Sequence, residues 1–346
     1  MPTKSYFLGC PTPEGFSTNI TEDINSGVLF AYILKGGPGT GKSTLMKKVA
    51  ANLNDAELYY CSSDPDSLDA VISREKGIII VDGTAPHVFD PTYPGVSQRI
   101  VDLGQFWNKE KLAESKDLVI TLTDDNKRLH SRGKRYLKAA SGLYQDILAV
   151  GEFALNRQKL DAYAERLTSK LIPKIPDKHG KVSRRRITSI TPKGIITQES
   201  AFIGCKLYYI DDSCIAVTDR LLKTLSVMAV NRGYDVIVST NPILPDSVYD
   251  HIIIPKLGIA FTSKPLSGAQ KINSLRFYDN GILKSKRKRL QFAATAGTEL
   301  IKETANVLAK AKAVHDDLES HYIAAMNFDA LNEYTKTLVD EICSRT

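Results

Sequence analysis

The spacing of apolar residues predicts alternating strands and helices in the first third of the chain and long helices after it. Short apolar runs at 28–35, 57–61 and 77–82 have the length of buried strands, and stretches with helical spacing separate them. This alternation predicts an α/β fold, with a mostly parallel sheet and helices on both of its faces. From about 109 to 170 the apolar positions recur at helical spacing with few breakers, which predicts two or three long helices.

The second half of the chain repeats the first, which indicates a tandem duplication. Thr12-Pro13-Glu14-Gly15 recurs as Thr191-Pro192-Lys193-Gly194, and Asp69 before Gly77 recurs as Asp250 before Gly258. The helical regions match without gaps at a spacing of 171 positions (277 minus 106). The matched pairs include Phe106/Phe277, Leu129/Leu300, Leu137/Leu308, Asp146/Asp317, Asn156/Asn327, Leu160/Leu331, Tyr163/Tyr334 and Leu167/Leu338.

A stretch rich in proline and charge, from Ile172 to Lys181, separates the two repeats. Since 346 residues also exceed one ordinary domain, we expect two units. The expected division is unit one at 1–172 (α/β region at 1–105, helical region at 106–172), a linker at 173–184, and unit two at 185–346 (α/β region at 185–270, helical region at 271–346).

A glycine-rich segment directly follows the first long apolar run. It reads Gly-Gly-Pro-Gly-Thr-Gly-Lys-Ser-Thr and fits the phosphate-binding P-loop between a strand and a helix. Glycines let the backbone approach a ligand, and the amides at the helix start form a nest for phosphate. Lys42 should reach the β- and γ-phosphates, and Ser43 should ligate Mg²⁺. The expected nucleotide-binding residues are Gly36, Gly37, Pro38, Gly39, Thr40, Gly41, Lys42, Ser43 and Thr44. A glycine-rich turn that binds nothing would not explain a lysine at a helix start, where a cation opposes the helix dipole.

The strand at 77–82 ends in Asp82, which is the Walker B arrangement of a carboxylate beside the P-loop strand. There Asp82 could hold Mg²⁺ directly or through water. The next residue is Gly83, so the glutamate with which many ATPases activate water is missing. Thr84 and His87 could sense the γ-phosphate, although packing by its neighbours would also explain the histidine.

Asp64 and Asp66 follow the second predicted strand and should lie at the same edge of the sheet. Either could act as a general base or as a partner of Mg²⁺. A turn followed by a helix N-cap explains the same residues equally well. In the helical region, Arg128, Arg132 and Arg135 are weak candidates for an arginine finger.

Unit two has lost the glycine-rich segment. Aligning Leu45 with Leu222 places Asp219 opposite Lys42 and Arg220 opposite Ser43. No glycine remains, and the nearby carboxylates would repel phosphate. Phe261 stands opposite Asp82 in the same comparison. We therefore expect unit two to be structural or regulatory, with a metal or partner site at Asp211, Asp212 and Asp219 as the alternative.

Composition narrows the class of protein only modestly. Hydrophobic residues at 42% and charged residues at 25% are ordinary for a soluble protein. The five cysteines form no C-x-x-C pair, the N-terminus has no apolar leader, and the apolar runs are only strand-length. These features favour a cytoplasmic protein with no membrane segment.

The net charge of +7 is concentrated in two basic runs, at 181–186 and 284–289. Either run could contact nucleic acid, but solvated linkers and helix faces are commoner. No aromatic residues alternate with the basic ones, as base stacking would require.

The chain resembles a family of bacterial ATPases of the P-loop NTPase superfamily that are built from two tandem units. The resemblance rests on the P-loop, on Cys-Ser-Ser-Asp-Pro-Asp-Ser-Leu-Asp at 61–69 and on Val-Asp-Gly-Thr-Ala-Pro-His at 81–87, and it covers essentially the full length. It implies ATP binding at 36–44 followed by hydrolysis. Relatives often keep a glycine-rich loop in the second unit, which this chain lacks.

The leading expectation is therefore Mg²⁺-dependent ATP hydrolysis at one site in unit one. Lys42, Asp82 and Asp64 are the expected catalytic residues, and Ser43 and Asp82 the expected metal ligands. ATP is favoured over GTP because the guanine-reading motif Asn-Lys-x-Asp is absent. Alternatives are a kinase for a nucleotide or another small molecule, and a nucleotide-gated module for a protein or nucleic-acid partner. A homo-oligomer is compatible with each alternative.

Overall fold

The computed structural model describes residues 3–85, 87–244 and 247–345. It contains two six-stranded sheets with equivalent strand orders, which confirms the α/β class and the tandem duplication. In each sheet five strands are mutually parallel, and the third strand from one edge is antiparallel to them. In spatial order, sheet one is β1 (Lys4–Phe7), β5 (Glu57–Tyr60), β6 (Leu68–Ser73), β7 (Ile78–Asp82), β4 (Phe30–Lys35) and β8 (Gln98–Asp102). Sheet two is β9 (Val182–Arg184), β13 (Val236–Thr240), β14 (Tyr249–Ile254), β15 (Ile259–Thr262), β12 (Lys206–Asp211) and β16 (Gln270–Asn273).

The antiparallel strand β6 corrects the sequence interpretation, which expected a helix between the strands at 57–61 and 77–82. All six residues of β6 are buried. A strand buried on both faces lacks the alternation of polar and apolar residues that identifies strands, so its pattern does not separate it from a helix.

Each unit also carries a small β-hairpin built on its Thr-Pro-x-Gly segment. In unit one β2 (Gly9–Thr12) pairs with β3 (Gly15–Thr18), and in unit two β10 (Thr188–Thr191) pairs with β11 (Gly194–Thr197). Gly15 and Gly194 both have positive φ, so glycine suits these turns. The repeated motif therefore specifies a turn.

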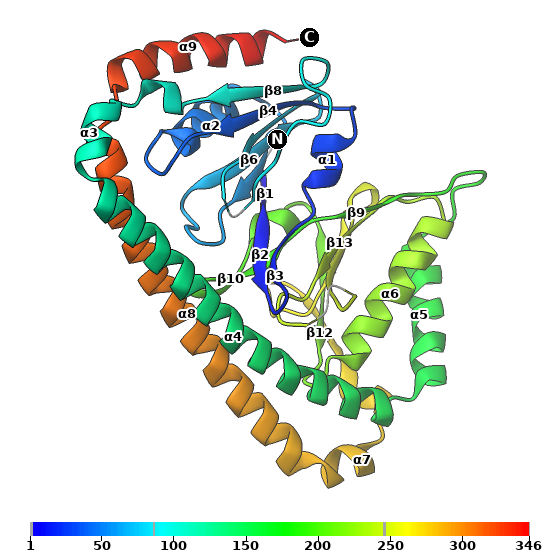
Figure 1. The fold of residues 1–346 in the computed structure, drawn as a ribbon. Helices are drawn as coiled ribbons and strands as arrows, with labels where there is room; N and C mark the ends of the chain where they lie inside the picture. Colours follow the sequence, from blue (N-terminus) through cyan, green and yellow to red (C-terminus); the bar gives the residue numbers. More distant parts are fainter. Residues whose placement is uncertain (1–2, 86, 245–246, 346) are drawn as a thin grey trace.

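Two long helices connect the units (Figure 1). The helices α4 (Lys116–Ala154) and α8 (Arg287–Ala324) lie side by side, and contacts such as Asn126 with Ala311 and Arg289 with Asp146 show that they run antiparallel. The prediction of long helices between 109 and 170 is confirmed. Among the described residues, no helix is long and apolar enough to cross a membrane.

The helices that follow α4 and α8 are exchanged between the units. Helix α5 (Arg157–Leu171) packs on α6 (Ala216–Asn231) of unit two, and α9 (Phe328–Ser344) packs on α2 (Lys42–Ala51) of unit one (Figure 1). The junctions are equivalent. Directly before the short helix α3 (Lys109–Glu114), the Asn108 amide donates a hydrogen bond to the Ala325 carbonyl oxygen at 2.8 Å. Directly before the short helix α7 (Asn280–Ser285), the Asp279 amide donates the matching hydrogen bond to the Ala154 carbonyl oxygen, also at 2.8 Å.

The hydrophobic core corrects the expectation of helices on both faces of each sheet. On one face, alternate strand residues such as Tyr32 and Leu34 pack with α2 and α9, and sheet two packs likewise with α5 and α6. On the other face, residues such as Ile33 and Ile253 belong to one core shared by both sheets. In the described stretches of the chain, only the short α1 (Thr21–Asn25) and η2 (Glu199–Phe202) contribute helical residues to that shared core.

Half of the basic run at 181–186 is structural, which corrects its interpretation as a solvated linker for Arg185 and Arg186, whereas Lys181 and Arg184 are exposed. Residues 182–184 form the edge strand β9. Arg185 is buried, 3.2 Å from Asp23 of unit one, and the buried Arg186 donates to Ser17 of unit one at 2.6 Å and to Thr240 of unit two at 2.6 Å. Buried arginines with protein partners hold the two units together and are not presented to an external polyanion.

Gly151 marks the place where α4 crosses unit two. A Cβ at this position would lie 2.7 Å from the carbonyl oxygen of Cys214 and 2.9 Å from its Cβ. We expect Gly151→Ala to lower the free energy of unfolding by about 1–3 kcal/mol, because backbone must move to admit the methyl group. Urea denaturation measures this change.

Gly142→Ala on the same helix is the matched control, since a Cβ there meets open space. We expect it to raise the free energy of unfolding by roughly 0.5–1 kcal/mol through helix propensity alone. Equal stabilisation by both substitutions would show that α4 does not make this contact.

Candidate functional site

The glycine-rich loop connects the carboxyl end of β4 to the start of α2. Gly39 and Gly41 have φ values of +70° and +76°, in the left-handed region that favours glycine. Thr40 closes the loop by donating from Oγ1 to the carbonyl of Gly37 at 2.9 Å. The two left-handed residues explain why this sequence adopts the turn.

The side chain of Lys42 lies inside this loop. Its Nζ donates to the carbonyls of Gly36 and Gly37, at 3.1 and 2.8 Å, and lies 3.6 Å from Oδ2 of Asp82. Lys42 and Asp82 meet because β4 and β7 are adjacent parallel strands, so their carboxyl ends share one edge of the sheet. This is the proximity that the expected roles of the two residues require.

A second carboxylate and a histidine lie beside Asp82. Single ligand atoms of Asp69, Asp82 and His87 all lie within 4.8 Å of one another, close enough to hold one metal ion. His87 Nε2 is 3.7 Å from Asp69 Oδ2, while its buried Nδ1 has no hydrogen-bond partner among the described residues. Asp82 accepts from Thr84, from N at 2.9 Å and from Oγ1 at 2.6 Å.

Asp69 is the site residue that sequence reasoning missed. It lies on β6, which pairs with β7, and it is buried. The available signal was an aspartate within an apolar run, repeated as Asp250 in unit two. The sequence pattern predicts a helix in place of β6, and a helix would not place Asp69 next to Asp82, so the pattern does not identify Asp69 as a site residue.

Burial controls the protonation of this cluster. Desolvation, reinforced by the nearby charge of Asp82, raises the pKa of Asp69 to about 8. Desolvation lowers the pKa of His87 to about 4, so its imidazole is neutral at pH 7. Burial also raises the pKa of the Cys61 thiol, with the charge of Asp69 adding to the effect. A divalent cation would favour the ionised carboxylates and the neutral imidazole.

The remaining predicted residues occupy less central places. Ser43 Oγ accepts from the Leu68 amide at 3.0 Å, and Thr44 is exposed on the first turn of α2. Asp64 accepts from Ser67 Oγ at 2.8 Å and lies 3.8 Å from Lys312 Nζ on α8. A strand follows this turn, so the alternative of a helix N-cap is wrong.

Two of the predicted arginines have partners along the helical pair. Arg128 lies 2.8 Å from Asp125, and Arg132 lies 3.5 Å from Glu303. The role of an arginine finger stays a prediction.

The end of α8 covers the glycine-rich loop. A Cβ on Gly37 would lie 3.0 Å from the Tyr322 ring and 3.2 Å from the Trp107 ring. A Cβ on Gly39 would lie 2.7 Å from Ile323 and 3.1 Å from Glu319. A helix that begins in unit two therefore contacts the proposed phosphate site in unit one, and the absence of side chains at 37 and 39 permits the close approach.

The equivalent loop of unit two keeps some of the backbone geometry without the glycines. Ile215, just before α6, has φ +68°, close to the φ of Gly41 just before α2. The contacts with the neighbouring strand place Asp219 opposite Ser43, one residue from the match in the sequence comparison. Asp219 accepts from the Tyr249 amide at 2.8 Å, as Ser43 Oγ accepts from the Leu68 amide, and Tyr249 and Leu68 have equivalent register positions on β14 and β6. Asp219 also lies 2.7 Å from Lys223 Nζ.

The strand register also changes the match for Asp82. Asp82 is the fifth residue after Gly77, and the fifth after Gly258 is Ser263, whereas the sequence comparison chose Phe261. Ser263 donates to Asp250, the counterpart of Asp69. In either alignment unit two has no lysine opposite Lys42 and no carboxylate opposite Asp82.

A carboxylate of the protein itself occupies the start of α6. Asp212 accepts from the amides of Thr218 at 2.9 Å and Cys214 at 3.1 Å, and from the Tyr278 hydroxyl at 2.8 Å. The same hydroxyl accepts from the Val217 amide at 3.0 Å. Amides that bind phosphate in an anion nest are therefore already bonded within unit two.

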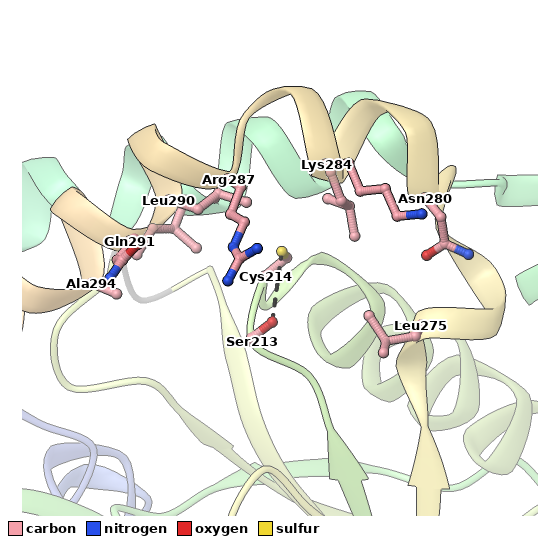
Figure 2. Close-up of a pocket in the computed structure, with 11 residues that line it drawn as sticks. Ser213, Cys214, Leu275, Asn280, Lys284, Arg287, Leu290, Gln291 and Ala294 are labelled. Carbon is pink, nitrogen blue, oxygen red and sulfur yellow. Dashed lines mark hydrogen bonds between the residues drawn. The ribbon is translucent and has the colours of Figure 1, made fainter.

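A pocket of about 500 Å³ lies beside this loop (Figure 2). Ser213 and Cys214 form one side, and α7 and α8 form the other with Lys284, Arg287 and Leu290. Two residues of the second basic run thus face a pocket, while a third, Arg289, pairs with Asp146.

No family model, curated protein or solved structure matches this chain.

The raised pKa of Asp69 predicts a pH dependence of stability in the absence of metal. The pKa of about 8 lies above the ordinary value of 3.8, so folding favours the protonated carboxyl. This stabilisation is complete below about pH 4 and is lost as the pH rises through 8. Between about pH 4 and 8, the free energy of unfolding of the unaltered chain should fall relative to that of Asp69→Asn, by at most about 1.4 kcal/mol per pH unit.

Urea denaturation in EDTA between pH 4.5 and 8.5 measures the difference between the two chains. The control is Asp66→Asn, because Asp66 is exposed, lies 2.8 Å from Lys193 Nζ, and has a lowered pKa. Its difference from the unaltered chain should stay constant over this range. A constant difference for Asp69→Asn as well would show that Asp69 is not a buried, protonated acid.

Proposed function

We propose that the chain binds Mg-ATP at the glycine-rich loop and hydrolyses it, as a P-loop NTPase with one working site. The observation that carries this proposal is the position of Lys42. Its ammonium group lies in a loop of two left-handed glycines, 3.6 Å from the Asp82 carboxylate on the neighbouring strand. Lysine, helix-start amides and a strand-end carboxylate are the groups that nucleotide phosphates and Mg²⁺ require.

The residues would act as follows. Lys42 exchanges the carbonyls of Gly36 and Gly37 for the β- and γ-phosphate oxygens, which offer an anionic partner. Ser43 and Asp82 would hold Mg²⁺, which would supply charge neutralisation on the phosphates. The amides of the loop, fixed by the Thr40 bond to Gly37, orient the triphosphate.

Asp69 is the best-placed base for the attacking group. The residue after Asp82 is glycine, and the expected base Asp64 is engaged with Ser67 and Lys312. Asp69 lies beside Asp82 on the adjacent strand and is held near the neutral imidazole of His87. Once ionised beside a bound cation, its carboxylate can accept a proton from water or from a substrate hydroxyl.

The side chains that pack over the glycine-rich loop support phosphotransfer to a small molecule as the second candidate function. Trp107, Tyr322 and Ile323 lie against the loop and would exclude bulk water from a bound triphosphate. A kinase needs such exclusion to avoid wasteful hydrolysis. Phosphate release without any added acceptor supports the ATPase, whereas ATP consumption only with a particular small molecule supports the kinase.

The binding site can be tested with Lys42→Ala. We expect this variant to lose the thermal stabilisation that Mg-ATP gives the unaltered chain, because the charge that grips the phosphates is gone. The control is Lys48→Ala on the exposed side of α2, which should keep the full shift in melting temperature. Unchanged ATP affinity in Lys42→Ala would refute the site.

The base can be tested with Asp69→Asn in steady-state kinetics. We expect kcat to fall by roughly 10²–10⁴, the range of general base catalysis, while ATP affinity changes little. Asp64→Asn serves as the comparison and should keep most of its kcat. A large loss with Asp64→Asn and none with Asp69→Asn would return the role to the residue expected from sequence.

A further inference from the structure

A second hollow, of about 420 Å³, lies between α5 and the open edge of sheet two. Its lining is strongly basic. Five cationic side chains face it, from α5, β12, β16 and the short helix η4 (Ser274–Phe277). They are Arg166, Lys170, Lys206, Lys271 and Arg276.

Little of this positive charge is compensated. Among the residues that the structure describes, the one ion pair made by these five side chains joins Lys271 to Asp211 at 2.6 Å. Like charges around one hollow repel each other, and an anionic ligand would relieve the repulsion. The arrangement therefore favours a polyanion over a single charge.

Aromatic rings position two of the cations. The Arg276 guanidinium carbon lies 4.4 Å from the Tyr163 ring centroid and 4.7 Å from that of Phe277. Lys206 Nζ lies 5.7 Å from the Tyr208 ring centroid. A guanidinium held against rings still presents N–H groups, which suit the bidentate geometry of phosphate. The rings themselves are already covered, so they do not offer a platform for a base.

The duplication provides an internal comparison. The equivalent place in unit one carries fewer cations. Arg99 lies 2.7 Å from Glu341, and the Arg345 guanidinium carbon lies 3.7 Å from the Phe30 ring centroid. The fold therefore does not require a basic cluster here. The spacing of 171 positions matches Arg166 with Thr337, Lys170 with Glu341, Lys271 with Ile100 and Arg276 with Gln105. The starts of β12 and β4 match Lys206 with Phe30.

We propose that this hollow, defined by its five cations, binds a ligand with two or more linked phosphate groups. The ligand is either a free polyphosphorylated metabolite or the backbone of single-stranded nucleic acid, which share this chemistry. Recognition acts on phosphates and not on bases, because Tyr163 and Tyr208 are covered. The site is independent of the glycine-rich loop and does not rest on the proposed function.

The test replaces two cations with their unit-one counterparts, as Arg166→Thr with Lys170→Glu. Both positions are exposed, so the fold should be kept. The probes are inorganic tripolyphosphate, followed by calorimetry, and a fluorescein-labelled 15-nucleotide oligo(dT), followed by anisotropy. For the tripolyphosphate titrations every variant also carries Lys42→Ala, so that the glycine-rich loop does not bind the probe. The oligonucleotide titrations are carried out both with and without Lys42→Ala.

We expect the double variant to weaken binding of at least one probe by about tenfold or more, since each charge-assisted contact contributes substantially. The control is Lys138→Glu with Lys336→Thr, which changes the net charge equally at exposed sites on other helices. Binding of tripolyphosphate alone identifies a free metabolite as the source. Binding of the oligonucleotide with steep salt dependence identifies a nucleic-acid backbone. No binding of either probe, or an equal loss in the control, would overturn the proposal.

Discussion

The exchange of α5 and α9 is the constraint on which the rest of the structure depends. Each sheet has an apolar face that its own unit covers only partly. Helix α2 is short, and the face above it is completed by Leu331, Leu338 and Ile342 of α9. Unit two depends on α5 in the same way. Because α4 and α8 must span the distance between the sheets, they pair along their lengths, and the end of α8 comes to rest on the glycine-rich loop.

The sequence predicts the features that nearby residues or a regular repeat specify, and it does not predict the features that depend on contacts between distant parts of the chain. The glycine-rich loop and the strand that ends at Asp82 are readable because neighbouring residues specify them, and the duplication is readable because the two copies share residues at a constant spacing. Strand β6 could not be read, because both of its faces are buried, and with it the position of Asp69 was lost. The exchange of α5 and α9 leaves no local trace, since an amphipathic helix has the same pattern whichever sheet it covers.

The two copies differ in charge at two equivalent places, and the differences are opposite in sign. At the strand-to-helix loop, unit one presents Lys42, whereas unit two inserts the Asp212 carboxylate among the amides. At the edge of the sheet, unit one neutralises Arg99 with Glu341, whereas unit two gathers five cations. Ile215 adopts a left-handed conformation that costs a β-branched residue about 1–2 kcal/mol, and the loop that contains it has no glycine. The two units need each other to bury the core that they share, but these charges lie outside that core. The fold can therefore tolerate different charges at equivalent places of the two units.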